Sequence, residues 1–469
     1  MKLVAALVTA LLLTGCVAGP DFRTPDAPAA NRYTTEVLPS LTLSSAQPGE
    51  AAVPEMWWSL FHSPKLDETV RVALEGNRDL KVAQATLKQA SELLGATRAA
   101  RLPEVTAEAS NGRQKLGAAF LGGFNLPPFT YYSVGTSVSY AFDFAGGVHR
   151  TVEQNAALAE AQAHEVDAAR LSLTGNVVLQ AFAIASARAQ IRAAEGVLED
   201  DRRNVELVRK AFEEGSVPRL DLLSAESQLA QDQTLLPPLR QELSAARHAL
   251  AVLVGEAPGN WSPPDFDLED FALPATLPLS LPSELARRRP DIRSEEAQLH
   301  AATAAVGVAA ANLYPQIRLT GSLSQQAITL GSLFDSKNDA FSLAGNVTAP
   351  IFDFGRRRAE KRASEAALQA SLARYEQTVL IAFRQVADVL SALEHDTQDT
   401  EAQQRALDVA ESSLALTRES YSAGNTGVLQ ILDAERQVQR ARMGVARARA
   451  QKMRDTAELV VALGGDSPL

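Results

Sequence analysis

The sequence is poor in cysteine, in aromatic residues and in grouped histidines, and each shortage excludes a class of protein. Its 469 residues contain one cysteine, so no disulfide framework can form within the chain. The six histidines are scattered and match no metal-ligand spacing, and there is no phosphate-binding loop or arguable Ser–His pair. We therefore expect no enzyme, cofactor or metal. A net charge of −11 argues against a nucleic-acid partner.

The composition favours helices. Hydrophobic residues make up 46% of the chain, but aromatic residues only 6%. Alanine supplies much of the apolar content, and its small side chain and high helix propensity suit closely packed helices. We expect a protein that is mainly α-helical.

The N-terminus reads as an export signal. Met1 and Lys2 precede a short apolar run, which is too short to span a bilayer and is typical of a secretory signal peptide over residues 1–15. The string Leu13-Thr-Gly-Cys16 resembles a bacterial lipobox, which implies cleavage before Cys16 and lipidation of its thiol. An ordinary signal with an incidental cysteine is the alternative. By the same resemblance, Val17 in place of aspartate favours the outer membrane.

The next residues, 16–63, read as an extended arm, because they are rich in Pro, Ala, Ser and Thr up to about residue 54. Two tryptophans and Phe61 near the end of the arm are expected to anchor it against a helix. The Arg run 287–289 further along is expected to form a solvated surface with carboxylate partners.

The body of the chain contains one pattern twice. We place a first repeat at 64–255, a Pro-rich linker at 256–283, a second repeat at 284–463 and a tail at 464–469. Pro315 follows Pro103 by 212 residues, and Phe352 follows Phe142 by 210. So many matched landmarks indicate an internal duplication. The pattern within each repeat predicts, in chain order, a helix, a two-strand hairpin, a long helix, a turn and a further helix.

The strands and the long helices have different periods. Apolar and polar residues alternate at about 104–112, 130–143, 315–326 and 340–353, which predicts strands. A helical pattern without proline runs from about residue 147 to Glu214, a rod of roughly 95 Å at 1.5 Å per residue. Pro237 and Pro238 are expected to kink or split the helix that follows the first turn.

The turns after the two long helices are the most similar stretches of the two repeats. When Gly215 is set on Gly424, Leu220 falls on Leu429, with an offset of 209 residues. The two glycines are expected to supply tight or left-handed turns. We call these two helix–turn–helix ends the first tip and the second tip.

The strands also predict an assembly. Their alternation is that of membrane-barrel strands, and in lipid every backbone polar group must be paired, so the strands must close into a barrel. Four strands are too few for this, since about eight are needed before an interior fits side chains. Several copies must therefore share one barrel. The long helices carry charges throughout and are expected to project into water.

The sequence resembles a TolC-family outer-membrane factor of the NodT-like lipoprotein subgroup, over nearly the whole mature chain. The resemblance rests on Leu13-Thr-Gly-Cys16, Gly19-Pro-Asp-Phe22, Trp57-Trp-Ser-Leu-Phe61, the string from Leu281 to Arg293, Phe352-Asp-Phe-Gly355 and Leu432-Asp-Ala-Glu-Arg436. It implies a homotrimer with a 12-stranded barrel and a 12-helix periplasmic tube. It also implies a periplasmic adaptor and an inner-membrane pump, commonly of the RND class, as partners.

The resemblance also assigns roles to tip residues. A periplasmic gate would be formed by Leu429, Asp433 and Arg436, with Leu429 as an apolar plug and Asp433 as a charged ring. The matching residues of the first tip include Leu220 and two serines, so it lacks the ion pair. The tips, with Gly215, Leu220, Gly424 and Leu429, would dock the adaptor.

The predicted function is therefore an outer-membrane exit duct of a tripartite efflux system. A type I protein-secretion conduit competes with this function, but the lipobox and the Arg-Pro-Asp-Ile string favour efflux. A periplasmic coiled-coil scaffold lipoprotein is the weaker alternative, because a scaffold needs no membrane strands. Neither the transported substrate nor the cognate pump can be read from the sequence.

Overall fold

The structure, a computed structural model, describes residues 17–26, 32–34, 43–44, 56–115, 127–274, 277–278, 285 and 287–465. The chain forms two compact units. The strand unit comprises Met1–Pro25, Thr86–Ala163 and Ser294–Glu376, and the helical unit comprises Asp26–Ala85, His164–Arg293 and Gln377–Leu469. Each unit draws on both predicted repeats, since the division falls within the long helices. The repeat boundaries themselves stay a prediction.

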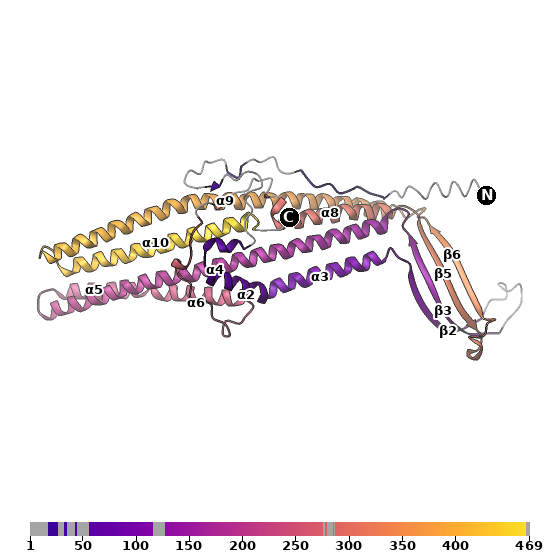
Figure 1. The fold of residues 1–469 in the computed structure, drawn as a ribbon, viewed down its shortest axis with the longest axis horizontal. Coiled ribbons are helices and arrows are strands. Elements are labelled where there is room, and N and C mark those ends of the chain that lie inside the picture. The colour runs from indigo at the N-terminus through magenta and orange to yellow at the C-terminus, as the bar shows by residue number, and fades with distance from the viewer. Residues whose placement is uncertain are drawn as a thin grey trace. The chain divides into compact units, whose positions relative to one another are not determined.

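The helices follow the pattern of the sequence (Figure 1). Their bounds are α2 Pro64–Gly76, α3 Arg78–Ala99, α4 Gly147–Glu213, α5 Arg219–Gln233, α6 Leu236–Leu253, α8 Pro290–Ala311, α9 Arg356–Ser422 and α10 Val428–Ala462. Short 3-10 turns lie at η1 Trp57–Phe61, η3 Leu268–Asp270 and η4 Leu330–Ser332.

The two long helices have the same length. Both α4 and α9 contain 67 residues, and they begin 209 residues apart at Gly147 and Arg356. After the tips the repeats differ, because α10 is continuous whereas the corresponding stretch is split into α5 and α6. The split falls just before Pro237 and Pro238, which lie in the first turn of α6. Proline is tolerated there because those N–H groups have no intrahelical acceptor.

An aspartate side chain caps the N-terminal end of each long helix. The Asp143 carboxylate accepts hydrogen bonds from the backbone N–H groups of Val148 and His149, at 3.0 and 2.8 Å. Asp353 accepts from Gly355 and Arg357, at 3.0 and 3.2 Å. These backbone hydrogen bonds lower the pKa of Asp353 below its ordinary value. The matched Phe-Asp-Phe strings therefore mark the transition from strand to helix.

The strand unit contains an antiparallel sheet of order β2-β3-β5-β6, and its strands lie side by side in Figure 1. Its strands are β2 Glu104–Gln114, β3 Phe129–Phe142, β5 Gln316–Ala327 and β6 Asp339–Thr348. β6 stops at Thr348, before the predicted 353, and Pro350, which has no N–H to donate to a ladder, follows two residues later. Within the described residues β2 and β6 are the open edges of the sheet.

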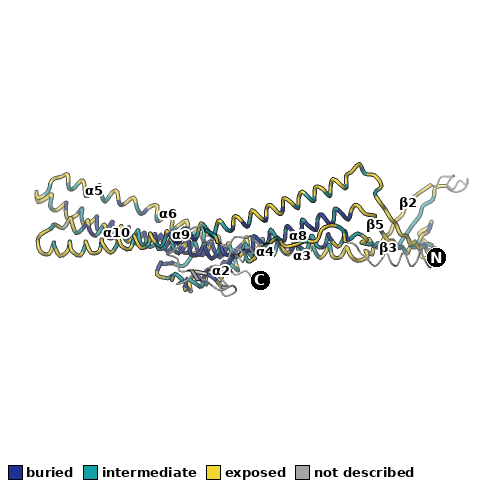
Figure 2. The backbone as a smooth tube through the Cα atoms, turned by 90° about the horizontal axis from the view of Figure 1, so that it is seen from above, coloured by how far each residue is buried: buried dark blue, intermediate teal, exposed yellow. Residues whose placement is uncertain are grey.

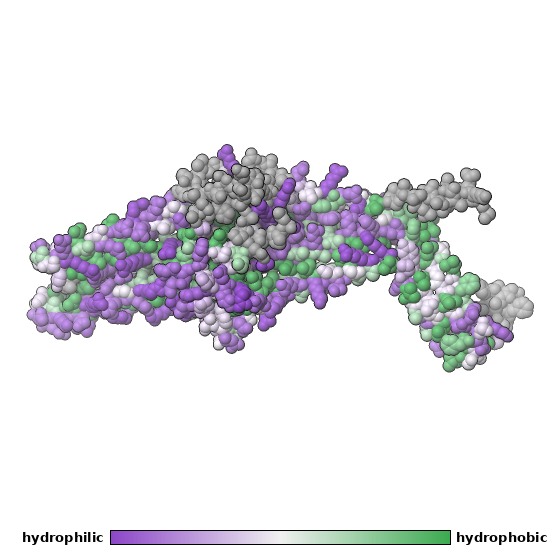
Figure 3. All heavy atoms as spheres, viewed as in Figure 1, coloured by the Kyte–Doolittle hydropathy of each residue, from purple (hydrophilic) through white to green (hydrophobic). Residues whose placement is uncertain are grey.

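The register gives this sheet two different faces. One row across the four strands is Val105, Val138, Gly321 and Leu343, and the next row, on the opposite face, is Thr106, Ser137, Ser322 and Ser342. On the polar face the hydroxyls of Thr106 and Ser137 are 2.7 Å apart. On the apolar face Phe341 and Leu343 of β6 are 85% and 86% exposed. Figure 3 shows hydrophobic residues gathered over the sheet.

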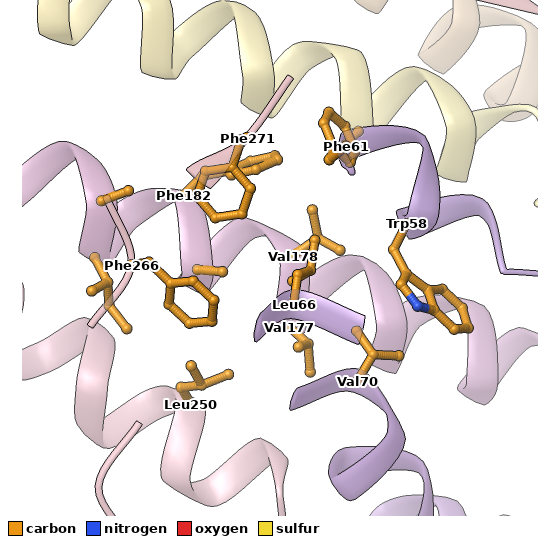
Figure 4. Close-up of a cluster of buried hydrophobic side chains, with 14 of the residues drawn as sticks. Trp58, Phe61, Leu66, Val70, Val177, Val178, Phe182, Leu250, Phe266 and Phe271 are labelled. Atoms are coloured by element: carbon orange, nitrogen blue, oxygen red, sulfur yellow. The ribbon is translucent and has the colours of Figure 1, made fainter. Parts of the chain in front are cut away.

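The main hydrophobic core lies in the helical unit (Figure 4). Phe182 of α4 is fully buried, and its ring lies edge-on to Phe61 and Phe271, with centroids 4.9 Å away in each case. Trp57 donates a hydrogen bond to Thr174 of α4 at 3.2 Å. This aromatic string therefore anchors the end of the arm, as its composition predicts. Leu43–Ser44 (β1) pairs in parallel with Leu277–Pro278 (β4) of the linker.

The arginine run is not the solvated surface that its charge predicts. Arg289 is buried, 8% exposed, and donates to the carbonyl of Ala462 and to Gln385, each at 2.8 Å. It also pairs with Asp291 at 2.7 Å. One guanidinium thus connects the start of α8 to α9 and to the end of α10. The expectation holds for Arg287, which is exposed.

One helix among the described residues, α4, is long and apolar enough to cross a membrane by length and composition. Half of its most apolar stretch is, however, buried inside the protein. A buried core helix passes the same test, so this feature does not identify a membrane span.

Removal of the central core ring should destabilise the helical unit. Phe182→Ala leaves a cavity at a fully buried site and should lower the free energy of unfolding by about 3–5 kcal/mol. Phe212→Ala is the matched control, because Phe212 lies on the same helix but is 37% exposed. Denaturant titration of the detergent-solubilised protein measures both. An equal loss in the two variants would contradict this placement of the core.

Candidate functional site: the two helix tips and the N-terminal clasp

The two tips, both in the helical unit, have the same backbone geometry. Gly215 and Gly424 have φ values of 74° and 75°, in the left-handed region. At the first tip the N–H of Ser216 bonds to the carbonyl of Ala211, and at the second tip Asn425 bonds to Ser420. A left-handed glycine with a hydrogen bond to the carbonyl five residues back is the usual end of an α-helix. The predicted turn role of both glycines is confirmed.

An ion pair behind each tip is also duplicated. Arg209 of α4 contacts Glu226 of α5 at 2.8 Å, and Arg418 of α9 contacts Glu435 of α10 at 2.6 Å. The second pair follows the first by 209 residues at both positions. Because both tips contain this pair, we assign it to joining the two helices of a tip.

Among the described residues, only the second tip has an ion pair in the first turns of the helix that follows it. Asp433 accepts from Arg436 at 2.7 Å and from Gln437 at 2.9 Å. The Asp433 side chain is 52% exposed and that of Arg436 is 20% exposed. At the first tip Ser224 takes the place of Asp433 and bonds to the carbonyl of Leu220. The structure thus brings Asp433 and Arg436 together, as an (i, i+3) pair on one face of α10.

The leucines of the tips point away from their own core. Leu220 is 70% exposed and Leu429 is 41% exposed, and each is the second residue of its helix. Figure 2 shows exposed backbone around α5 and the ends next to it. Each tip therefore presents an apolar side chain that the single chain does not cover.

Arg150, which sequence reasoning missed, holds the described N-terminal residues. It is 3% exposed and donates to the carbonyl of Ala18 at 3.1 Å, to Asp21 at 2.6 Å and to Glu153 at 2.7 Å. We call these contacts the N-terminal clasp. Val17 is the first described residue, so the predicted lipidation site Cys16 lies outside the described residues. The matched Gly19-Pro-Asp-Phe22 string is the signal that could have indicated a docking segment.

Further contacts stabilise the N-terminal clasp. His300 of α8 contacts Glu153 at 3.0 Å, and its ring stacks on Phe22 with centroids 4.4 Å apart. Burial raises the pKa of Glu153, but hydrogen bonds from Arg150 and His300 outweigh it, so the pKa lies below its ordinary value. The backbone N–H of Ala18 also bonds to Ala145, just after β3, at 3.0 Å. Ala18 is therefore fixed beside the end of β3.

No group of three or more His, Cys, Asp or Glu side chains that could hold a metal occurs in the part of the chain that the structure describes.

Substitution of the tip glycine should loosen the tip without a steric clash. A methyl group at Gly424 meets nothing within 4 Å, so Gly424→Ala changes only the backbone energy, by about 1–2 kcal/mol. Hydrogen exchange of the amides at residues 423–425 should accelerate. Gly95→Ala, equally uncrowded but with an ordinary helical backbone, should leave exchange at the tip unchanged. Unaltered exchange in Gly424→Ala would contradict the role of the left-handed turn.

Removal of the clasp should release the N-terminal segment. In Arg150→Ala the segment loses its hydrogen bonds at Ala18 and Asp21, so trypsin should cleave after the exposed Arg23 faster than in the wild-type protein. Arg71→Ala, which removes an exposed arginine paired with glutamates, is the control and should not change the rate. Equal rates in all three proteins would show that other contacts hold the segment.

The sequence is similar to those of known proteins over most of its length. The family model described as outer membrane efflux protein matches residues 69–256 and 281–465. The chain is 29% identical over 464 residues to a probable outer membrane lipoprotein, SilC of Salmonella typhimurium, covering 98% of each protein. It is 32% identical over 426 residues to the pyoverdine export outer membrane protein OpmQ of Pseudomonas aeruginosa, covering 89% of this chain and 88% of that protein.

Solved structures agree with the sequence comparison. The outer-membrane channel OprN superposes with a TM-score of 0.87 at 30% identity, covering 96% of this chain and 99% of that one. The open state of the Neisseria gonorrhoeae MtrE outer membrane channel gives a TM-score of 0.80 at 28% identity, with coverage of 96% and 98%. The predicted resemblance is confirmed: the chain belongs to the outer membrane efflux protein family and is an outer-membrane component of an efflux system.

Proposed function

We propose that three copies of this protein form one continuous duct, with a 12-stranded barrel in the outer membrane and a 12-helix tube in the periplasm. The observation that carries the proposal is the open four-stranded sheet. Its edges β2 and β6 have no partner strand within the described residues, and one of its faces is apolar. Unpaired edges are not tolerated in lipid, so edge strands of neighbouring copies must pair.

The two faces of the sheet suit this assembly. Its strands contain 10 to 14 residues, and a membrane-crossing strand needs about 9–11. The apolar row would face lipid, while serine, threonine and Arg318 would line a water-filled interior. Arg318 donates to Ser139 on the polar face at 3.0 Å, which keeps its charge hydrogen-bonded there.

The N-terminal clasp supports a lipid anchor at Cys16. Ala18 is held beside the residues that follow β3, so a lipidated Cys16 would lie two residues from that point. The acyl chains would then enter the same membrane as the sheet. The clasp would then hold the anchor and the barrel at a common level in the membrane.

The second tip is proposed as the gate. Three copies of Leu429 would form an apolar constriction, and three copies of Asp433, each beside Arg436, would form a charged ring below it. The exposed leucines at Leu220 and Leu429 offer apolar contacts to a periplasmic adaptor. Through that adaptor the duct would receive solutes from an inner-membrane pump, which we infer to be of the RND class.

The cargo is proposed to be a low-molecular-mass solute. Relatives of this chain are named for export of pyoverdine and for efflux of toluene. The duct conducts without chemistry of its own, so the pump upstream selects the substrate.

Conductance in planar bilayers tests the gate. Leu429→Ala or Asp433→Ala should raise the single-channel conductance severalfold, because each removes part of the constriction. Leu220→Ala and Ser224→Ala are the matched controls at the first tip and should leave conductance unchanged. If the second-tip variants conduct like the wild-type protein, or if the controls rise equally, the second tip is not the gate.

A further inference from the structure

Two buried aspartates lie on the two helices that meet at the first tip. Asp201 of α4 is 5% exposed and Asp232, near the end of α5, is 3% exposed. Both positions are buried within a single chain, so an assembly can only bury them further. A buried carboxylate needs hydrogen-bond donors or a counter-ion, because desolvation strongly disfavours its charge.

Among the described residues, the hydrogen-bond donors near this pair bond to Asp232 and not to Asp201. Asp232 accepts from Gln228 at 2.7 Å and from Arg440 of α10 at 3.4 Å. Oδ2 of Asp201 is buried and accepts no hydrogen bond from any donor in the described part of the chain. The carboxyl group of Asp232 raises the pKa of Asp201, both through its negative charge and through a hydrogen bond that a proton held between the two would supply. Two carboxyl groups can share a hydrogen bond only when one of them carries a proton.

The pKa of Asp201 is raised as a result. Burial raises its pKa, and the hydrogen bond and negative charge of Asp232 raise it further, to about 6. Arg436 and Arg440, both on α10, act in the opposite direction. A proton bound here would therefore leave as the pH rises from about 5 to 7.

The fold does not require these acids. The residues 209 positions further on, at the same places in the second repeat, are Ala410 and Ala441. Alanine therefore suffices where the equivalent long helix and tip helix run. The carboxyl pair is a feature added to one repeat, which points to a role other than packing.

We propose that Asp201 and Asp232 form a proton-binding site between α4 and α5, and that loss of the proton draws Arg436 away from Asp433. The released proton goes to solvent and leaves two carboxylates with a net charge of −2 in place of −1. Arg436 is placed to respond, because its Nε is buried and has no partner among the described residues, while its Nη2 donates to Asp433. Arg440 already contacts Asp232.

Other charged residues lie near Asp201. Asp200, next to Asp201, has a raised pKa because of its burial and the charge of Glu435, and Arg203 and Arg418 oppose the rise. Arg418 is held by Glu435 at 2.6 Å. Arg203 and Arg418 thus act on Asp200, whereas Arg436 and Arg440 are the cations that lower the pKa of Asp201.

The consequence for conduction rests on the proposed gate. When the pair is protonated, Arg436 neutralises Asp433 and the ring of three Asp433 side chains repels itself least, so a closed tip is favoured. When the pair is ionised, Arg436 is shared and the ring repels itself more. Acid should therefore favour closure. The proton site itself does not depend on whether the tip is a gate.

Infrared spectroscopy tests the site without any need for conduction. The wild-type minus Asp201→Asn difference spectrum of the purified protein should show a protonated-carboxyl band that disappears with a midpoint near pH 6. Arg436→Gln should raise that midpoint by about one pH unit, because it removes an opposing cation. Asp388→Asn, at an exposed aspartate paired with Arg384, should leave the band and midpoint unchanged.

Two results would overturn the proposal. If the difference spectrum shows no titrating band, no proton is held at Asp201 and Asp232. If the band titrates but Arg436→Gln leaves its midpoint unchanged, the site is not linked to the residue that holds Asp433. Failure of the proposed gate would instead appear as unaltered conductance in Leu429→Ala, with the infrared band still present.

Discussion

The two edges of the sheet, whose strands have no partner within the described residues, set the requirement on which the rest of the structure depends. A four-stranded sheet with one apolar face cannot remain open in lipid, and four strands cannot close on themselves around an interior. The closure by neighbouring copies that we propose would satisfy both constraints. Each chain would then also supply a matching share of the helices, through the 67-residue helices α4 and α9 that follow the two hairpins.

Duplication explains how one chain builds two such parts, and divergence shows where they work differently. The left-handed glycines and the pairs Arg209–Glu226 and Arg418–Glu435 are common to both tips. The Asp433–Arg436 pair belongs to the second tip, and the Asp201–Asp232 pair belongs to the first repeat. Arg436 contacts Asp433, and its charge lowers the pKa of Asp201. In our proposal the two departures from the repeat are connected through this arginine.

Local features of this fold could be predicted from the sequence, because their causes are local. The absence of proline gave the extent of α4, strand alternation gave the two faces of the sheet, and glycine spacing gave the tip turns. The family was also predictable, since its motifs are contiguous strings. The ion pair between Asp433 and Arg436 could be found because the two residues share a helix face.

Long-range partners could not be predicted in this way. Periodicity does not reveal that Arg289 reaches Ala462, or that Arg150 reaches back to Ala18. The charged run at Arg289 suggested solvent, yet a carbonyl, an amide and a carboxylate converge on it from elements far apart in sequence. The pKa of Asp201 likewise depends on Asp232 of α5 and on Arg436 and Arg440 of α10. Such sites become visible only when the helices are assembled.

The mass of the detergent-solubilised particle tests the shared barrel most directly. Native mass spectrometry should give the mass of three chains, each of 50.1 kDa before removal of the signal peptide and addition of lipid. A particle with the mass of one chain that still conducts in bilayers would contradict the requirement that neighbouring copies close the sheet.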